Sequence, residues 1–396
     1  MSDIKRNIRN QTEPEDTADD NYDTRIRNHR KHTGYAILIV ILVLAVTVLI
    51  VVMVTRKSSF SGYTSLGHIT LSSDSQSVIR SFGDGFVKIT RDGASAYDNA
   101  CNALWDVTFE ISEPAVDMCG NYFIAYDKGG LNMYIVGVDG FSKSIRTNLP
   151  ILKGVVSANG VAAVILEDST ADYIRMFDKE GNTVSDIKVV LSQTGTPINI
   201  DISEDGDYMM VSYVTIEGTK LASSVVFYNF GSAGQDVNQK LIGGFASDAL
   251  VPAVYFINDA VAASISENQL RLYSVGRNVA EIKTIDFEDR VNRIFYSDKY
   301  IGIVTMPEDG DYVIRVYDAK GQQEMKYETD FLYDHYGFTD SYIYMYADSD
   351  VKMLNMAADT VFEYTFDDDV VAFDIQSGDK YYVHASPSLI ERIKLK

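Results

Sequence analysis

The stretch INIDISEDGDYMMVSYV, from Ile198 to Val214, holds two apolar runs separated by a compact polar segment. Both runs are rich in residues that favour β-strands, and the Asp and Gly between them suit the tight backbone of a β-turn. The stretch therefore predicts a β-hairpin with Gly206 in its turn.

Turns of this kind recur along the chain, each between two short β-rich runs. They lie at Gly83, Gly120, Gly160, Gly206, Asp259, Asp298, Asp340 and Gly378, with spacings of 37, 40, 46, 53, 39, 42 and 38 residues. A period of this size is typical of repeat architectures in which each repeat is one supersecondary unit.

A second series of turns alternates with the first. An aromatic or apolar residue followed by a small polar one occurs at Tyr97-Asp98, Val138-Asp139, Phe177-Asp178, Tyr228-Asn229, Tyr273-Ser274, Tyr317-Asp318 and Leu354-Asn355, mostly at the end of a strand-like run. Two hairpins per repeat of about 40 residues correspond to a four-stranded propeller blade. We predict an all-β propeller of eight blades, with seven as the alternative, behind one N-terminal transmembrane helix.

The last repeat begins at Val370 and contains only three strand-like runs. The segment from Tyr63 to Leu71 has the alternation of apolar and polar residues that is compatible with a strand. We expect it to supply the missing strand, because pairing the two chain ends would close the ring and remove an exposed sheet edge.

The predicted transmembrane helix is the apolar run YAILIVILVLAVTVLIVVMV, residues 35–54. At about 1.5 Å per residue, a helix of this length spans about 30 Å, which is the hydrocarbon thickness of a bilayer. A cleaved signal peptide is the alternative. Its apolar region is usually only roughly 7–15 residues long, and no small-residue cleavage site follows this run, so an uncleaved signal anchor is favoured.

Flanking charge sets the predicted orientation. Arg25, Arg27, Arg30 and Lys31 precede the run, and only Arg56 and Lys57 follow it closely. Lys and Arg near a span tend to stay on the cytoplasmic side, so we expect a cytoplasmic N-terminus and an extracytoplasmic propeller at the cell membrane. The predicted parts are a disordered tail over 1–33, the helix over 34–55, a juxtamembrane linker with the ring-closing strand over 56–76, and the propeller over 77–396.

The composition is strongly acidic, with a formal net charge of -21. This charge argues against nucleic acid as a partner and leaves cationic ligands, metal ions or a basic protein surface. Acidic loops are expected between the middle strands of several blades: Glu167, Asp168 and Asp172; Glu308, Asp309 and Asp311; Asp348 and Asp350. Carboxylates there could bind calcium or a basic partner, and the simpler alternative is that they are solvated loop charges.

Signatures of catalysis are absent from the sequence. His and Cys show no metal-ligand spacing, and neither a G-x-S-x-G nor a nucleotide-binding glycine motif occurs. We therefore predict no catalytic residue and no cofactor. Cys101 and Cys119 are expected on one face of the propeller, where a disulfide and two free thiols both remain open.

Several strings resemble one known family. GTPINIDISEDGDYMMVSYV (Gly195 to Val214), VVFYNFG (Val225 to Gly231) and NLPI (Asn148 to Ile151) are similar to an uncharacterised family of single-pass, membrane-anchored propeller proteins of Gram-positive bacteria. The resemblance implies architecture and placement, since that family has no assigned activity. In outline the chain is also similar to WD40-like and quinoprotein-like propellers, although the G-H and W-D signatures of the former and the Trp-rich repeats of the latter are missing.

These observations predict a membrane-anchored, extracytoplasmic propeller that acts as a protein-binding or scaffolding module of the cell envelope and not as an enzyme. An extracytoplasmic sensor of a small ligand or glycan is the alternative. It would use exposed tyrosines, but Tyr333, Tyr336, Tyr342, Tyr344 and Tyr346 are expected mainly in the core. A propeller hydrolase or quinoprotein-type enzyme is the third alternative.

Overall fold

The computed structural model describes residues 38–47, 59–71, 77–218, 220–231, 234, 240–308 and 310–396. The chain divides into two compact units, Met1–Ser58 and Ser59–Lys396. In the first unit, residues 38–47 are helical. Within the described residues, no helix has the length and apolar character that crossing a membrane requires. The rest of the run 35–54 and all of the tail 1–33 lie outside the described residues.

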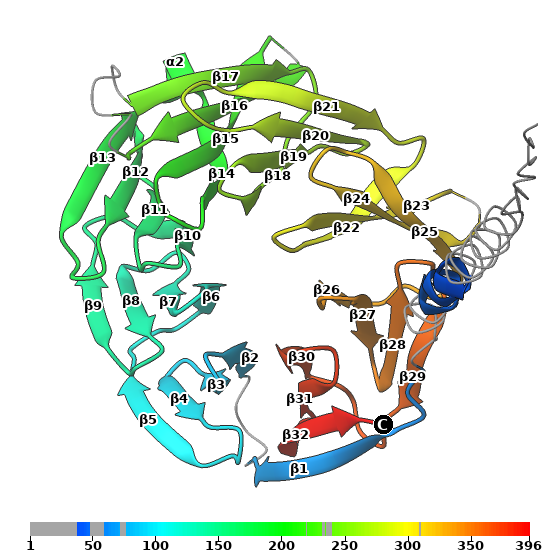
Figure 1. The fold of residues 1–396 in the computed structure, drawn as a ribbon. Helices are drawn as coiled ribbons and strands as arrows, with labels where there is room; N and C mark the ends of the chain where they lie inside the picture. The colour runs from blue at the N-terminus through cyan, green and yellow to red at the C-terminus, as the bar shows by residue number, and fades with distance from the viewer. Residues whose placement is uncertain are drawn as a thin grey trace, which may run out of the picture. The chain divides into compact units, whose positions relative to one another are not determined.

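The second unit is a ring of eight four-stranded antiparallel sheets, which we number as blades 1–8 (Figure 1). The eight-blade prediction is confirmed. Blade 1 contains β2 (Val78–Phe82), β3 (Gly85–Ile89), β4 (Gly93–Tyr97) and β5 (Ala103–Thr108). Blade 2 contains β6 (Pro114–Cys119), β7 (Tyr122–Asp127), β8 (Asn132–Gly137) and β9 (Ser142–Arg146). Blade 3 contains β10 (Ile151–Val156), β11 (Ala162–Leu166), β12 (Asp172–Phe177) and β13 (Thr183–Val189). A short helix, α2 (Leu191–Thr194), leads to blade 4, which contains β14 (Thr196–Ile202), β15 (Tyr208–Glu217), β16 (Lys220–Asn229) and β17 (Leu241–Ser247).

The remaining blades follow the same order from the axis outward. Blade 5 contains β18 (Ala253–Asn258), β19 (Val261–Ile265), β20 (Gln269–Ser274) and β21 (Ala280–Asp286). Blade 6 contains β22 (Arg290–Tyr296), β23 (Tyr300–Met306), β24 (Tyr312–Asp318) and β25 (Gln323–Thr329). Blade 7 contains β26 (His335–Phe338), β27 (Tyr342–Ala347), β28 (Asp350–Asn355) and β29 (Thr360–Thr365). Blade 8 contains β30 (Ala372–Ser377), β31 (Tyr381–Ala385), β32 (Leu389–Leu395) and, as its outermost strand, β1 (Tyr63–Thr70).

The ring is closed by the pairing of the two ends of the propeller chain, as predicted. β1 runs antiparallel to β32, with Tyr63 opposite Leu395 and Thr70 opposite Leu389 (Figure 1). Beyond the strands, the amide of Lys396 donates to the carbonyl of Gly62 at 2.9 Å. The last blade therefore satisfies its outer edge with a segment from the other end of the chain.

The core lies between the blades. Apolar side chains from facing sheets form separate clusters, such as Val211 and Tyr213 of blade 4 against Ile174 and Met176 of blade 3. Tyr344 and Tyr346 of the Tyr-rich blade are also buried. Their predicted place in the core is confirmed, which removes them from any exposed sugar-binding surface.

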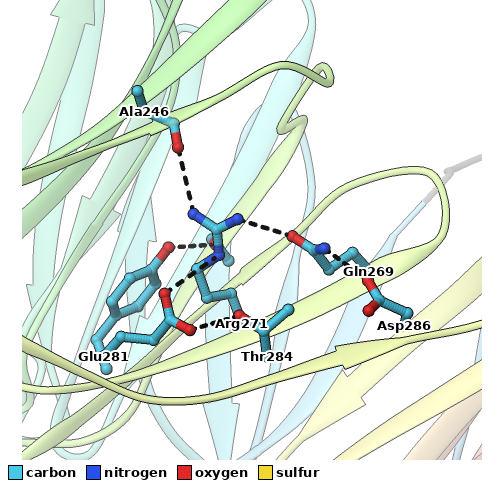
Figure 2. Close-up of polar contacts among 8 residues, drawn as sticks. Ala246, Gln269, Arg271, Glu281, Thr284 and Asp286 are labelled. Atoms are coloured by element: carbon cyan, nitrogen blue, oxygen red, sulfur yellow. Dashed lines mark hydrogen bonds and ion pairs between the residues drawn. The ribbon is translucent and has the colours of Figure 1, made fainter.

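Near the rim, a polar side chain on the third strand of a blade often contacts both its own outer strand and the preceding blade. Figure 2 shows this arrangement at Arg271 of β20, whose guanidinium donates to the carbonyl of Ala246 on β17 at 3.3 Å and to Gln269 at 3.0 Å. Its Nε lies 3.7 Å from the Glu281 carboxylate. We call such a group a rim clasp.

Rim clasps recur at the equivalent position of other blades. Arg175 of β12 donates to Asp186 of its outer strand at 2.8 Å and to Asn148, in the connection from blade 2, at 2.9 Å. Lys352 of β28 pairs with Glu363 at 3.2 Å and lies over the ring of Tyr327 in blade 6. These contacts join neighbouring blades where the apolar core thins out.

The ring closure makes a testable prediction. The ring of Tyr63 packs on Tyr364 and Phe366, with centroid distances of 5.3 and 5.2 Å. Tyr63→Ala should lower the free energy of unfolding by about 1–3 kcal/mol, because β1 loses its aromatic contact with blade 7. Thermal unfolding with Thr70→Ala as control, an exposed position on the same strand, measures this effect. Equal stability of the two variants would contradict the proposed importance of the contact.

Candidate functional site

The hairpins between the first and second strands of the blades lie at one end of the ring, which we call the inner-turn face. Hydrogen bonds join neighbouring turns there: the Ala158 amide donates to the Glu204 carbonyl at 2.9 Å, and the Asp205 amide donates to the Asp259 carboxylate at 3.0 Å. The side-chain amide of Asn258 donates to the Asp298 carbonyl at 3.1 Å. These contacts fix the positions of the acidic turns.

Two cavities open among these turns and the ends of the innermost strands. The first, which we call the axial cavity, has a volume of about 200 Å³ and is lined by residues of blades 2, 3, 4, 5 and 6. The second, of about 270 Å³, is lined by blades 6, 7 and 8 and shares Ser297 and Asp298 with the first. A lining drawn from so many blades places the cavities at the centre of the inner-turn face.

Two carboxylates from innermost strands line the axial cavity. Asp117 of β6 accepts a hydrogen bond from the Val156 amide at 2.7 Å, and Asp201 of β14 accepts one from the Phe256 amide at 2.6 Å. Each bond reaches the innermost strand of the next blade. Both side chains therefore join blades as well as present oxygen atoms to the cavity.

The electrostatic environment of these two groups is unusual. Burial raises the pKa of Asp117 to about 6, and burial together with the charge of Asp117 raises the pKa of Asp201 to about 7. Burial lowers the pKa of Lys153, while the charges of Asp201 and Asp117 act in the opposite direction. Lys153 donates to Asn199 at 3.1 Å, so its ammonium group is held beside the two carboxylates.

The pKa of the Cys119 thiol is affected by the same carboxylates. The pKa of this thiol is raised to about 12. Burial is the largest cause, and the negative charges of Glu204, Asp117 and Asp201 add to it. A thiol in such surroundings is a poor nucleophile, since the thiolate is the reactive form. Cys101 lies at the outer turn of blade 1, and both cysteines are free, so the disulfide that the sequence left open is not formed.

The acidic residues predicted from the sequence lie at the opposite end of the ring. Those that the structure describes lie in the connections between the second and third strands of blades 3, 6 and 7, as expected, or, for Asp172 and Asp350, at the first residue of the third strand, but blade 3 is not adjacent to the other two blades. The same connections of blades 1 and 2 carry the cations Arg91 and Lys128, and that of blade 5 carries Glu267. The structure thus brings Glu308, Asp311, Asp348 and Asp350 to neighbouring blades and separates them from Glu167, Asp168 and Asp172.

Some of these carboxylates already accept hydrogen bonds from their own loop or from the outer strand of their blade. Asp168 accepts the amide of Ser169 at 2.7 Å, and Asp350 accepts the hydroxyl of Thr365 at 2.5 Å. Asp172 is buried, and burial raises its pKa. Asp309 lies outside the described residues, and the described side chains form no group of three His, Cys, Asp or Glu that could hold a metal ion. Binding at these loops stays a prediction.

Sequence reasoning missed the axial carboxylates. A usable signal existed, because an Asp interrupts the strand that precedes the inner turn in PAVDMC, INIDI and AFDI. The third of these, Asp374 of β30, accepts the Ser81 amide of the next blade at 2.7 Å, so the same contact occurs three times. Only the spatial ring shows that Asp117 and Asp201, far apart in sequence, line one cavity.

The raised pKa values predict a pH dependence of stability. Between about pH 4 and pH 7 the folded protein holds more protons on Asp117 and Asp201 than the unfolded chain, so stability should fall as the pH rises through this window. Asp201→Asn removes one titrating group, and relative to the wild type it should gain stability toward pH 7, on the order of 1–3 kcal/mol.

Chemical denaturation at several pH values measures this difference. Ser297→Ala is the matched control, because it removes a polar group from the same cavity without removing a titrating one. Its effect should be constant across the window. A constant effect of Asp201→Asn would contradict the burial of a proton on this carboxyl group.

Comparison with known proteins agrees with the observed architecture. BamB from Moraxella catarrhalis is similar in structure, with a TM-score of 0.53 and 14% sequence identity, over 85% of this chain and 98% of that one. Sqt1 from Chaetomium thermophilum has a TM-score of 0.53 and 11% identity, over 84% of this chain and 100% of that one. At these identities the likeness shows the propeller fold alone, and no curated protein is significantly similar in sequence. The model of DUF5711, a family of unknown function, matches residues 55–395, and the chain therefore belongs to this family.

Proposed function

We propose that this protein is a protein-binding module of the cell envelope and that its inner-turn face binds a basic segment of the partner. The observation that carries the proposal is the concentration of carboxylates around the axial cavity, where Asp117, Asp201 and Glu204 add to the effect of burial in raising the pKa of the Cys119 thiol. Exposed Glu204, Asp298 and Asp340 extend the negative charge over the neighbouring turns.

Charge complementarity explains why a basic partner fits this face. Carboxylates crowded on a surface repel one another, and an incoming Lys or Arg relieves that repulsion while it gains attraction to each of them. The hydrogen bonds between turns hold the acidic groups in place before a partner arrives, which reduces the entropy lost on binding. Binding, and not catalysis, is the role that we propose.

The proposal also includes the location of the module. The apolar run 35–54 with its basic flank on the N-terminal side supports a single-pass signal anchor, a cytoplasmic N-terminus and an extracytoplasmic propeller. The resemblance to membrane-anchored propeller proteins of Gram-positive bacteria supports the same placement. A protein held this way could assemble partners at the membrane surface.

Charge reversal tests the binding surface. In Glu204→Lys/Asp298→Lys/Asp340→Lys, the partners recovered by crosslinking in native membranes and mass spectrometry should fall by about tenfold, because attraction becomes repulsion at the contact. The matched control is Glu167→Lys/Glu308→Lys/Asp311→Lys at the opposite end of the ring. Loss of partners only in this second variant would assign binding to the loops predicted from the sequence, and unchanged partners in both would overturn the protein-binding proposal.

Fractionation tests the anchor. The full chain should stay with membranes after alkaline carbonate extraction, whereas a chain that begins at residue 58 should be soluble, because it lacks the apolar run. Protease added outside intact cells should digest the propeller of the full chain. A full chain that carbonate releases from membranes would contradict the anchor, and a propeller protected in intact cells would contradict the orientation.

A further inference from the structure

A crevice at the rim of the ring lies between the outer parts of blades 3 and 4. It has a volume of about 630 Å³, within the range of small-molecule pockets, and is lined mainly by β13, β16 and β17. Figure 1 shows β13 and β17 as the outermost strands of neighbouring blades. The short helix α2 connects β13 of blade 3 to β14, the innermost strand of blade 4. The crevice is remote from the inner turns, so nothing in this inference depends on the proposed function.

The crevice exists because blade 4 lacks a rim clasp. Val226 of β16 pairs with Gly244 of β17, as Arg175 pairs with Asp186 and Lys352 with Glu363 in their blades. A Cβ atom at Gly244 would meet its nearest neighbour at 3.7 Å, an ordinary contact. The backbone therefore does not require glycine there, and the short side chains leave open the space that a clasp fills elsewhere.

Two buried tyrosines line this space. The hydroxyls of Tyr213 and Tyr228 lie 2.9 Å apart, and the two side chains are only 0% and 7% exposed. One hydroxyl donates a hydrogen bond to the oxygen of the other. The O–H of the accepting tyrosine then has no hydrogen-bond acceptor among the described residues. A buried donor without an acceptor is costly, so the site favours a ligand that brings an oxygen acceptor.

The remaining lining sets the character of such a ligand. Ile187, Val189, Val226 and Leu241 offer apolar surface. Lys240 also lines the crevice, and no ion pair of it is found in the described part of the chain. Asp186 and Lys188 stand opposite Arg175 and Tyr173 on the face of β13 that turns toward blade 2, and Asp186 is paired with Arg175. The unpaired charge is therefore positive and complements an anion, in contrast to the acidic protein as a whole.

We propose that this crevice binds a small amphipathic organic acid. Its apolar body lies between β13 and β17, its carboxylate faces Lys240, and an oxygen on the body accepts the free tyrosine O–H. The two ends of the crevice thus recognise two different parts of one molecule.

Displacement of the fluorescent probe 8-anilinonaphthalene-1-sulfonate from the full-length protein in detergent tests the proposal. Three competitors of equal length are compared: 10-hydroxydecanoate, decanoate and decan-1-amine. The hydroxy acid should compete best and the amine about tenfold less well than decanoate, because Lys240 repels the amine. An amine that competes as well as the acids would overturn the assignment of the carboxylate end.

Variants then locate the site. Val226→Arg/Gly244→Asp builds the clasp of blade 3 into blade 4, fills the crevice and should weaken binding of the hydroxy acid by about tenfold or more. The matched control, Arg271→Val/Thr284→Gly, removes the clasp of blade 5 and should leave binding at the crevice between blades 3 and 4 unchanged. Unchanged binding by the filled variant would overturn the proposal.

Two further variants test the proposal without adding bulk to the crevice, and they apply also if the filled variant does not fold. Tyr213→Phe/Tyr228→Phe removes both hydroxyls and should bring the affinity for 10-hydroxydecanoate down to that for decanoate. Lys240→Glu should reverse the preference between acid and amine. Wild-type behaviour in both variants would overturn the proposal.

Discussion

Pairing of β1 with β32 is the contact on which the rest of the propeller depends. Each blade buries both faces against neighbours, so an open ring would expose one face of blade 1, one face of blade 8 and an unpaired edge. Closure instead packs Ile79 and Phe86 of blade 1 against Val383 and Ile390 of blade 8. A hydrogen bond from the Ser81 amide to Asp374 spans the same junction at 2.7 Å.

Polar contacts between blades follow two patterns that depend on distance from the axis. Near the axis, an Asp on an innermost strand accepts an amide of the following blade, as Asp117 and Asp201 do. Near the rim, a third-strand side chain reaches toward the preceding blade, as Arg271 does. Where Asp117 and Asp201 meet, a charged cavity forms, and a crevice lies beside blade 4, where Val226 and Gly244 take the place of a rim clasp. Both candidate sites thus arise at particular blades of a regular ring.

The sequence predicted most of the fold because its main signal is local. Alternating apolar runs and turn residues such as Gly206 repeat along the chain, and each hairpin forms between neighbouring segments. The short last repeat and the strand-like Tyr63 to Leu71 were enough to predict closure. The acidic loops were also placed correctly between middle strands. Counting the repeats also assigned these loops to blades 3, 6 and 7. The hydrogen bonds that Asp168 and Asp350 accept could not be predicted from the sequence.

What the sequence alone determined was the repeating blade, the number of blades and the closing strand, since these depend on periodicity and on turn chemistry. The tertiary structure decided which side chains meet. Asp117 and Asp201 share a cavity although 84 residues separate them, and Val226 and Gly244 open a crevice only because β13 of another blade faces them. The physical reason is that a site at the axis or between blades is built by packing of sheets across the ring, and no local pattern along the chain records which sheets will face each other.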